Sequence, residues 1–224
     1  MTRTQSSSIT PGNAVIADAT GMGTILSDDL PSRTFVSAGG SDAGDCSVQT
    51  TPCRNIAGAL PQTAAEGEIT ILTPGEYETA PLTINKGIKI TSPSGTVAFI
   101  RQPIVINALG YRVALRGLTL KGNDGVDGIT VVAADSVSIE GTTFDGWSAG
   151  LCLATANPTQ VTVAGSVFTA NAVGLFDNPG GAVNLLAIEE SRFEGNSEGG
   201  IGIFLSSLAV RECSFTATGT GLWV

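Results

Sequence analysis

Two stretches, Val137-Ser-Ile-Glu-Gly-Thr-Thr-Phe144 and Val161-Thr-Val-Ala-Gly-Ser-Val-Phe168, decide the fold of this chain, because the second repeats the first after 24 residues. Three further segments align with them without gaps: Val113-Ala-Leu-Arg-Gly-Leu-Thr-Leu120, Leu186-Ala-Ile-Glu-Glu-Ser-Arg-Phe193 and Leu208-Ala-Val-Arg-Glu-Cys-Ser-Phe215. The last residues of the five segments are 24, 24, 25 and 22 positions apart. Such a period is typical of a repeat protein in which each unit stacks on the next.

The repeated segments alternate apolar and polar residues with a period of two and are rich in β-branched residues, which indicates strands. A glycine followed by an apolar residue comes after each segment: Gly128-Ile129, Gly150-Leu151, Gly174-Leu175, Gly200-Ile201 and Gly221-Leu222. No helical periodicity appears, and the leucine and asparagine spacing of leucine-rich repeats is missing. The sequence therefore predicts an all-β fold, a right-handed single-stranded parallel β-helix.

The aligned segments also predict which side chains fill the interior. One inward column holds Leu120, Phe144, Phe168, Phe193 and Phe215, with neighbours ~4.8 Å apart. Three residues after each member of this column stand Asn123, Trp147, Asn171, Asn196 and Thr218. Asparagine amides stacked at this position are expected to satisfy the backbone groups of the bends.

Earlier segments continue the coil less regularly, namely Ile69–Leu72, Leu82–Ile84, Ile88–Ile90, Phe99–Ile100 and Ile104–Ile106. Together they predict about seven or eight coils, in a β-helix domain over residues 34–224. Residues 52–60 read as one short helix, with Thr51 as N-cap and Pro52 as first residue, that closes the N-terminal end of the core. Residues 1–33 are expected to form a leader that is flexible or docks elsewhere.

Composition excludes several classes of function. The chain of 224 residues carries a formal charge of −9, which argues against nucleic acid as a partner. It contains no histidine, so a Ser-His-Asp triad, a histidine-ligated zinc site and a histidine general base are excluded. No apolar run approaches the ~18 residues of a membrane span, so membrane insertion is not expected.

The four cysteines bear on the compartment. Cys46 and Cys53 flank a short loop that suits a local disulfide in an oxidising compartment, although two free thiols are the alternative. A disulfide would place the protein in the secreted fraction or the cell envelope, yet no signal peptide is visible in the sequence. The stacking pattern places Cys152 on the outer face and Cys213 in the interior, too far apart to form a bond.

Several segments of the first half resemble a group of bacterial right-handed β-helix repeat proteins, the pectate-lyase-like solenoids. They are Phe35-Val-Ser37, the pair Asp45-Cys46 and Pro52-Cys53, Ile56-Ala-Gly-Ala-Leu60, Gly67-Glu-Ile-Thr-Ile-Leu72, Pro74-Gly-Glu-Tyr77 and Leu82-Thr-Ile-Asn-Lys-Gly-Ile-Lys-Ile90. The resemblance covers roughly Thr34 to Val224 and is specific for the fold. It carries no catalytic motif, and many members of the group have no assigned activity, so no catalytic residue is proposed.

Two pairs of carboxylates are candidates for binding calcium. Asp124 and Asp127 lie in Gly122-Asn-Asp-Gly-Val-Asp-Gly128, whose oxygens suit calcium, although these residue types also favour a plain turn. Glu190 and Glu212 share one column, in which other coils carry glycine. Stacked like charges raise one another's pKa or attract a cation, but a solvated surface pair is the alternative.

Other charges fall into register as neighbours of opposite sign on adjacent coils, and these read as structural. The expected pairs are Lys121 with Asp145, Arg116 with Glu140 and Glu189 with Arg211. Asp145 and Asp177 are expected to be exposed. Arg101 and Arg192 are then the spare basic residues of the coils, the ones that a catalytic role would need.

Three aromatic residues are candidates for binding a ligand. Phe176 and Trp223 belong to an outward column with Gly202 between them, and Trp147 is the third. Exposed aromatic rings can stack on sugars or form a protein contact, although scattered surface apolar residues are normal.

These observations favour an extracellular or envelope-associated structural or binding module. Its expected partners are a polysaccharide or, through an open C-terminal coil that ends in Gly221-Leu-Trp-Val224, a second copy of the chain. Truncation of a longer protein and a cap formed by residues 1–33 are the alternatives to such self-assembly. The alternative is a calcium-dependent enzyme similar to polysaccharide lyases. An acidic chain repels polyuronates unless a cation bridges the charges, which weakens that alternative.

Overall fold

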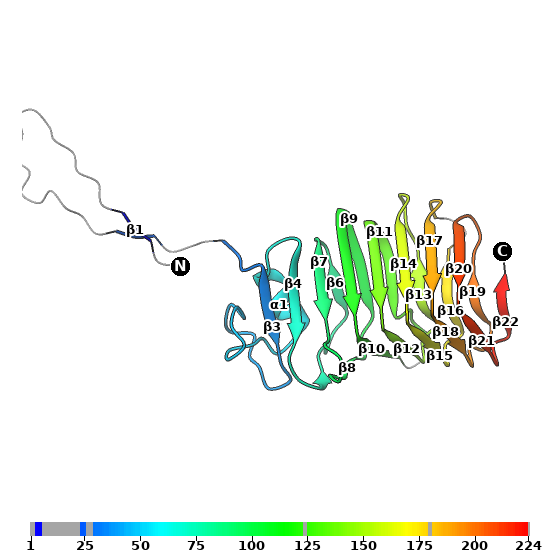
Figure 1. The fold of residues 1–224 in the computed structure, drawn as a ribbon, viewed down its shortest axis with the longest axis horizontal. Coiled ribbons are helices and arrows are strands. Elements are labelled where there is room, and N and C mark those ends of the chain that lie inside the picture. Colours follow the sequence, from blue (N-terminus) through cyan, green and yellow to red (C-terminus); the bar gives the residue numbers. More distant parts are fainter. Residues whose placement is uncertain (1–2, 6–22, 26–28, 123–124, 179–180, 224) are drawn as a thin grey trace, which may run out of the picture. The chain divides into compact units, whose positions relative to one another are not determined.

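The computed structural model describes residues 3–5, 23–25, 29–122, 125–178 and 181–223. The contacts divide the chain into two units, Met1–Leu30 and Pro31–Val224. In the first unit, strand β1 (Arg3–Gln5) pairs antiparallel with β2 (Gly23–Ile25). The second unit is a solenoid of stacked strands, drawn from blue to red in Figure 1.

Two parallel sheets run along the solenoid. The larger contains β3 (Arg33–Val36), β4 (Gly67–Ile71), β6 (Leu82–Ile84), β7 (Ile88–Thr91), β9 (Ile104–Arg116), β11 (Ile129–Glu140), β13 (Ala149–Leu153), β14 (Gln160–Ala164), β16 (Val173–Asp177), β17 (Leu185–Glu189), β19 (Gly199–Gly202), β20 (Ser207–Arg211) and β22 (Thr220–Trp223). The second has seven strands: β5 (Gly75–Glu76), β8 (Ala98–Ile100), β10 (Leu118–Lys121), β12 (Thr143–Asp145), β15 (Val167–Thr169), β18 (Arg192–Glu194) and β21 (Ser214–Thr216). The predicted parallel β-helix is confirmed, with about six turns instead of seven or eight.

Stacked phenylalanine rings fill the interior behind the smaller sheet, as the repeat predicts. Leu120, Phe144, Phe168, Phe193 and Phe215 pair in register from strand to strand. Successive phenylalanine rings are parallel, with centroids 4.5, 4.7 and 5.0 Å apart. The ring spacing matches the spacing of the strands, so each coil buries its apolar face against its neighbours.

Buried asparagines satisfy the bends that follow these strands. The side-chain oxygen of Asn171 accepts a hydrogen bond from the Trp147 amide at 3.0 Å, and that of Asn196 accepts from the Asn171 amide at 3.1 Å. Their Nδ2 groups donate to the carbonyls of Phe144 and Phe168. The predicted amide ladder is thus confirmed for Asn171 and Asn196, whereas Asn123 lies outside the described residues.

A second bend joins β9, β11, β14, β17 and β20 of the larger sheet to the strands that follow them in the smaller sheet, and it has a left-handed backbone. The residues at this point are Gly117, Gly141, Gly165, Glu190 and Glu212, with φ of 70°, 56°, 55°, 50° and 53°. Glycine adopts this conformation without strain, whereas a residue with a Cβ does not. The column of Glu190 and Glu212 is therefore first of all a bend.

The helix at the N-terminal end is shorter and later than predicted. Helix α1 spans Ile56–Gln62 with Asn55 as N-cap, so the prediction of residues 52–60 with Thr51 as N-cap is wrong. Cys53 instead forms a β-bridge with Val36, and the Asp42 carboxylate accepts hydrogen bonds from the amides of Arg54 and Asn55. The helix buries Ile56, Ala59 and Leu60 at the end of the core, as expected.

A disulfide and a buried carboxylate hold this end together. Cys46 and Cys53 form the predicted disulfide. Glu78 is buried, and its Oε1 accepts a hydrogen bond from the Ala57 amide of α1 at 3.0 Å. Burial raises the pKa of Glu78 to about 7, and the nearby charge of Asp42 acts in the same direction. Glu78 therefore holds α1 through the Ala57 amide, and ionisation of this buried carboxyl destabilises the folded state.

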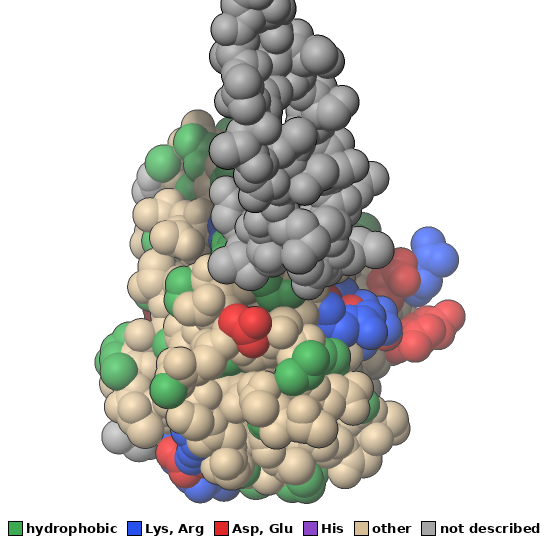
Figure 2. Space-filling view, turned by 90° about the vertical axis from the view of Figure 1, so that its left-hand side faces the viewer, with side chains coloured by type: hydrophobic (Ala, Val, Ile, Leu, Met, Phe, Trp, Pro, Cys, Tyr) green, Lys and Arg blue, Asp and Glu red, His purple; other side chains and the backbone are tan. Residues whose placement is uncertain are grey.

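Ion pairs link adjacent coils on the outside. The predicted pairs are present: Lys121 Nζ lies 3.0 Å from Asp145, Arg211 lies 3.8 Å from Glu189, and Arg116 pairs with Glu140. Arg101 and Arg192, expected to be spare, pair with Glu76 and Glu194. Figure 2 shows acidic and basic side chains lying together at the right-hand edge of the view and again at the lower left.

None of the helices in the described ranges has the length and apolar character that crossing a membrane requires.

Candidate functional site

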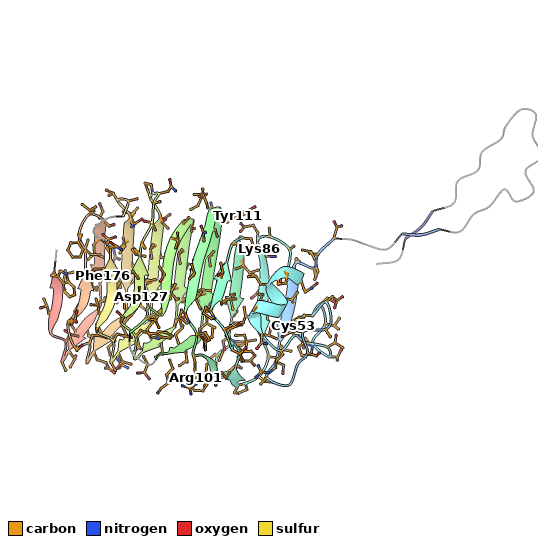
Figure 3. The ribbon with its side chains drawn as sticks, turned by 180° about the vertical axis from the view of Figure 1, so that it is seen from behind. Cys53, Lys86, Arg101, Tyr111, Asp127 and Phe176 are labelled. Carbon is orange, nitrogen blue, oxygen red and sulfur yellow. A yellow bond between two sulfur atoms is a disulfide. The ribbon has the colours of Figure 1, made fainter. Side chains whose placement is uncertain are left out.

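A hollow of about 310 Å³ lies on the outer face of β13 and β16, in the middle of the larger sheet. Its wall contains two carboxylates, an aromatic ring, a thiol and an amide, belonging to Asp127, Glu198, Phe176, Cys152 and Asn178. Figure 3 shows Asp127 and Phe176 on this side of the solenoid, away from Arg101 and Tyr111. We call this feature the central hollow.

Two further hollows adjoin the central hollow. One, of about 430 Å³, lies over the asparagine bend and shares Ser148 and Ala172 with it. The other, of about 210 Å³, lies where β13 and β16 end and shares Asn178. Because they share lining residues, we treat the three hollows as one shallow groove that runs along the strand direction. Strand β13 (Ala149–Leu153) alone covers roughly 16 Å of this direction at the rise of a strand.

Asp127 is fixed at one wall of the groove. It precedes β11, and its Oδ1 accepts a hydrogen bond from the Ala149 amide at 3.1 Å. Burial raises the pKa of Cys152 to about 12, with further contributions from the charge of Asp127 and a hydrogen bond to it. Cys152 therefore remains a neutral thiol. These contacts hold the Asp127 carboxylate in place, and as a half-buried group it still reaches the groove.

Phe176 lies at the centre of the groove, in the outward column that the sequence predicts. The register pairs Cys152 with Phe176, Phe176 with Gly202, and Gly202 with Trp223. Phe176 is half-buried and makes an edge-to-face contact with Phe204, with centroids 5.6 Å apart. Its ring is therefore held in place while part of its surface remains open to the groove.

Trp223 lies over the neighbouring glycines instead of projecting from the sheet. A Cβ added to Gly199 would approach its ring to 1.6 Å, and one added to Gly202 would approach to 2.4 Å. The two glycines thus allow the indole to lie flat against β19, and Trp223 is half-buried. That it binds a ligand together with Phe176 stays a prediction.

Trp147 is not the exposed aromatic residue that the sequence predicts. It is 1% exposed, because a Cβ at Gly122 or Gly128 would fall 2.5 or 3.2 Å from its ring and glycine at both positions leaves room for it. Its Nε1 has no hydrogen-bond partner among the described residues. Trp147 forms part of the groove floor, and a role as a stacking platform is excluded by its burial.

The metal-site candidates lie at two separate places in the described part of the chain. Glu190 and Glu212 sit at adjacent bends and are exposed. Asp124 lies outside the described residues, whereas Asp127 lines the groove. Within the described ranges, no group of three His, Cys, Asp or Glu residues could hold a metal ion. Calcium binding by these residues therefore stays a prediction.

Asp177, expected to be exposed, is fully buried. Its Oδ2 accepts hydrogen bonds from the successive amides of Phe204, Leu205 and Ser206, at 3.4, 3.3 and 3.2 Å. Three amides from one loop can stabilise a carboxylate in the interior. Asp177 thus supports the loop that carries Phe204, next to the groove, and does not line the groove itself.

Sequence reasoning missed Glu198, Asn178 and Ser148 as parts of the site. Each lies just before or just after a strand of the outward column that was identified, and the aligned repeats place Ser148 and Glu198 in one column. An examination of the residues that flank the outward column would have found them. The groove itself is harder to predict from sequence, because it forms only where the outward side chains are small, as at Ala149 and Ala172.

The groove can bind a hydroxyl-rich ligand. It offers carboxylate acceptors in the held Asp127 and the exposed Glu198, hydroxyl and amide groups in Ser148 and Asn178, and the ring of Phe176. Among the described residues that line the three hollows there is no Lys, Arg or His that could act as a base. The arrangement is therefore suited to binding a ligand, and the described lining lacks a basic residue that could remove a proton from it.

Comparison with known proteins agrees with the architecture. No family model matches the sequence, and no curated protein matches it. Among solved structures, the chain is similar to that of pectate lyase Pel9A, with 19% identity over 84% of this chain and a TM-score of 0.58. A rhamnogalacturonan lyase structure is also similar, with 9% identity over 84% of this chain and 74% of the other, at a TM-score of 0.45.

This chain spans about half of the pectate lyase Pel9A chain, 54% of its length. At 19% sequence identity, the similarity to Pel9A is a similarity of fold. The parallel strand order, the stacked interior and the similarity to Pel9A lead to the same conclusion: the chain has the pectate-lyase-like parallel β-helix fold.

Proposed function

We propose that this protein is an extracellular carbohydrate-binding β-helix module that holds a polysaccharide chain in the groove over β13 and β16. The observation that carries the proposal is the position of Phe176, a fixed and partly open aromatic ring with carboxylate, amide and hydroxyl groups on both sides. Binding sites for sugars combine an aromatic surface for the apolar face of the ring with a few polar groups for its hydroxyls.

Two further observations support the proposal. The disulfide between Cys46 and Cys53 suits an oxidising compartment outside the cytoplasm, where polysaccharides are met. The fold is that of a pectate lyase, a protein named for a polysaccharide substrate, although fold by itself does not establish function.

The decisive experiment measures binding by affinity gel electrophoresis and calorimetry on a panel of soluble plant and microbial polysaccharides. Wild type should bind at least one polymer, and Phe176→Ala should weaken that binding by about ten-fold or more, since stacking of the ring is lost. The matched control is Tyr111→Ala, an exposed aromatic residue on β9 outside the groove. Absence of binding to every polymer, or equal binding by Phe176→Ala, would refute the proposal.

A calcium-dependent lyase-like enzyme is the second candidate, favoured by the fold shared with pectate lyase Pel9A. The described lining of the groove has no basic residue to remove a proton, so we place this candidate behind the first. Release of unsaturated products from polyuronates, with and without calcium, decides between them. A calcium-dependent release that Glu190→Gln or Asp127→Asn abolishes would establish the enzyme.

Self-association through the last coil is a separate proposal. Val210 and Leu222 are 39% and 43% exposed on β20 and β22, and a second copy of the chain could cover them. Light scattering over a range of concentrations tests it: a mass that rises with concentration supports association, and a constant monomer mass excludes it.

A further inference from the structure

The charges of the groove are of one sign. Asp127 and Glu198 are the carboxylates in its described lining, and that lining contains no lysine or arginine. Asp127 is held by the Ala149 amide, and no cationic group in the described lining compensates its charge. Glu198 is exposed at the opposite wall.

The basic side chains of the coils are engaged elsewhere. Those with a carboxylate partner are Arg33, Lys89, Arg101, Arg116, Lys121, Arg192 and Arg211. Arg54 donates to the Glu76 carbonyl, and Lys86 donates to the Thr63 carbonyl. Arg112 has no ion-pair partner among the described residues, but it pairs in register with Ser136 in the larger sheet and does not line the groove. A polyanion in the groove would therefore meet carboxylates without a compensating cation.

The polar groups that do face the groove suit sugar hydroxyls. A carboxylate is an acceptor-only group when ionised, and a hydroxyl is the donor that satisfies it. The held Asp127 would bind one hydroxyl in a fixed position, while Phe176 covers the apolar face of the same or the next sugar. A carboxylate on the sugar would replace this donor by an acceptor and add like-charge repulsion.

From this arrangement we infer that the groove selects uncharged polysaccharides and rejects polyuronates, with Asp127 and Glu198 as the residues that determine the selectivity. The inference rests on the proposed function and names its ligand class. It separates this chain from the substrate named by the pectate lyase whose fold it shares.

The test compares two forms of one polymer, polygalacturonate and its fully methyl-esterified form, in which the ester removes the charge of each carboxylate and adds a methyl group, in buffer with EDTA. Wild type should bind the methyl ester at least about ten-fold more tightly than the polyanion. The double variant Asp127→Asn with Glu198→Gln keeps the shape of both side chains and should reduce that preference toward equality. The matched control, Asp135→Asn with Glu212→Gln, removes the same charge from exposed positions outside the groove and should retain the preference.

The outcomes distinguish a failure of the selectivity inference from a failure of the proposed carbohydrate-binding function. If wild type binds polygalacturonate as tightly as its methyl ester, or the control pair changes the preference as much as the groove pair, the selectivity inference is wrong. In that case Phe176→Ala would still weaken binding if the groove holds the sugar. If neither form binds, and no neutral polymer of the panel binds, the proposed function itself fails.

Discussion

The repeated coils from β10 to β21 and the end that carries α1 cover the same kind of apolar core by different means. The coils repeat one arrangement: a phenylalanine ring stacks on the ring of the next coil, and the amides of Asn171 and Asn196 stack at successive bends. The end is held by single contacts: one disulfide, the Asp42 carboxylate and the buried Glu78. Loss of one contact should therefore spread along the coils but remain local at the end.

Phe168→Ala should have the largest effect in this comparison. Phe168 is fully buried between the rings of Phe144 and Phe193, so truncation should lower the free energy of unfolding by about 3–5 kcal/mol. Urea denaturation measures the loss. The control is Phe215→Ala, whose half-buried ring stacks on Phe193 alone and should cost about half as much. Equal losses would show that stacking between coils does not carry the stability.

Glu78→Gln tests the end that carries α1 through its pH dependence. The pKa of Glu78 is raised to about 7 in the folded protein, above the ordinary value of 4.5. The folded state then holds a proton that the unfolded state has lost, so the contribution of Glu78 to stability is full below about pH 4.5 and disappears as pH rises through 7. The change is on the order of 2–3 kcal/mol.

The measurement for Glu78→Gln is thermal or urea unfolding between pH 5 and 8. Wild type should lose stability over this range relative to Glu78→Gln, which keeps an oxygen acceptor for the Ala57 amide but does not titrate. If the two stability profiles run parallel across the range, Glu78 does not titrate as the structure indicates.

The disulfide should contribute less than the stacked ring. Cys46 and Cys53 close a loop with a sequence separation of 7. Removing a disulfide that closes such a short loop should lower the free energy of unfolding by about 2 kcal/mol. The variant Cys46→Ser with Cys53→Ser should show this loss in urea denaturation, while hydrogen exchange of the coils from β10 to β21 remains unchanged. Faster exchange throughout those coils would contradict a local role.

Glu190→Gly should have the smallest effect and the opposite sign. Glu190 adopts φ of 50°, a conformation that glycine adopts without strain, as Gly141 and Gly165 do in the same column. Relief of strain outweighs the greater freedom of glycine in the unfolded chain by about 0.5–1 kcal/mol, so the variant should be more stable. Destabilisation by Glu190→Gly would indicate that its carboxylate has a role, and calcium titration of the same variant would then identify it.

The sequence predicts the structure correctly where residues repeat from coil to coil, and incorrectly where a single contact between residues far apart in the sequence determines the local structure. The rings of Phe144 and Phe168, the amides of Asn171 and Asn196 and the charge pairs follow from alignment of the coils, because stacking converts spacing into contact. The start of α1 depends on Asp42 and on the bridge between Cys53 and Val36. Neither contact belongs to a repeated position, so the alignment of the coils does not predict it.

The candidate site was found in part for the same reason. Alignment of the repeats predicts the outward column that contains Phe176, whereas Asp127 stands out through the Asn, Asp and Gly residues of its turn. The burial of Trp147 was missed because it depends on the absence of side chains at Gly122 and Gly128. Asp177 was misplaced because its partners, the amides of residues 204–206, have no side-chain signature.

The hold of Asp177 on that loop has an evolutionary consequence. The carboxylate grips backbone amides, which every residue except proline possesses, so the identity of the outward side chains is irrelevant to the anchor. Leu205 can then vary while the coil beneath it stays intact, whereas Phe204 is retained by its contact with Phe176. Natural variants of this protein should vary more at position 205 than at 204, keep aspartate at 177, and avoid proline from 204 to 206.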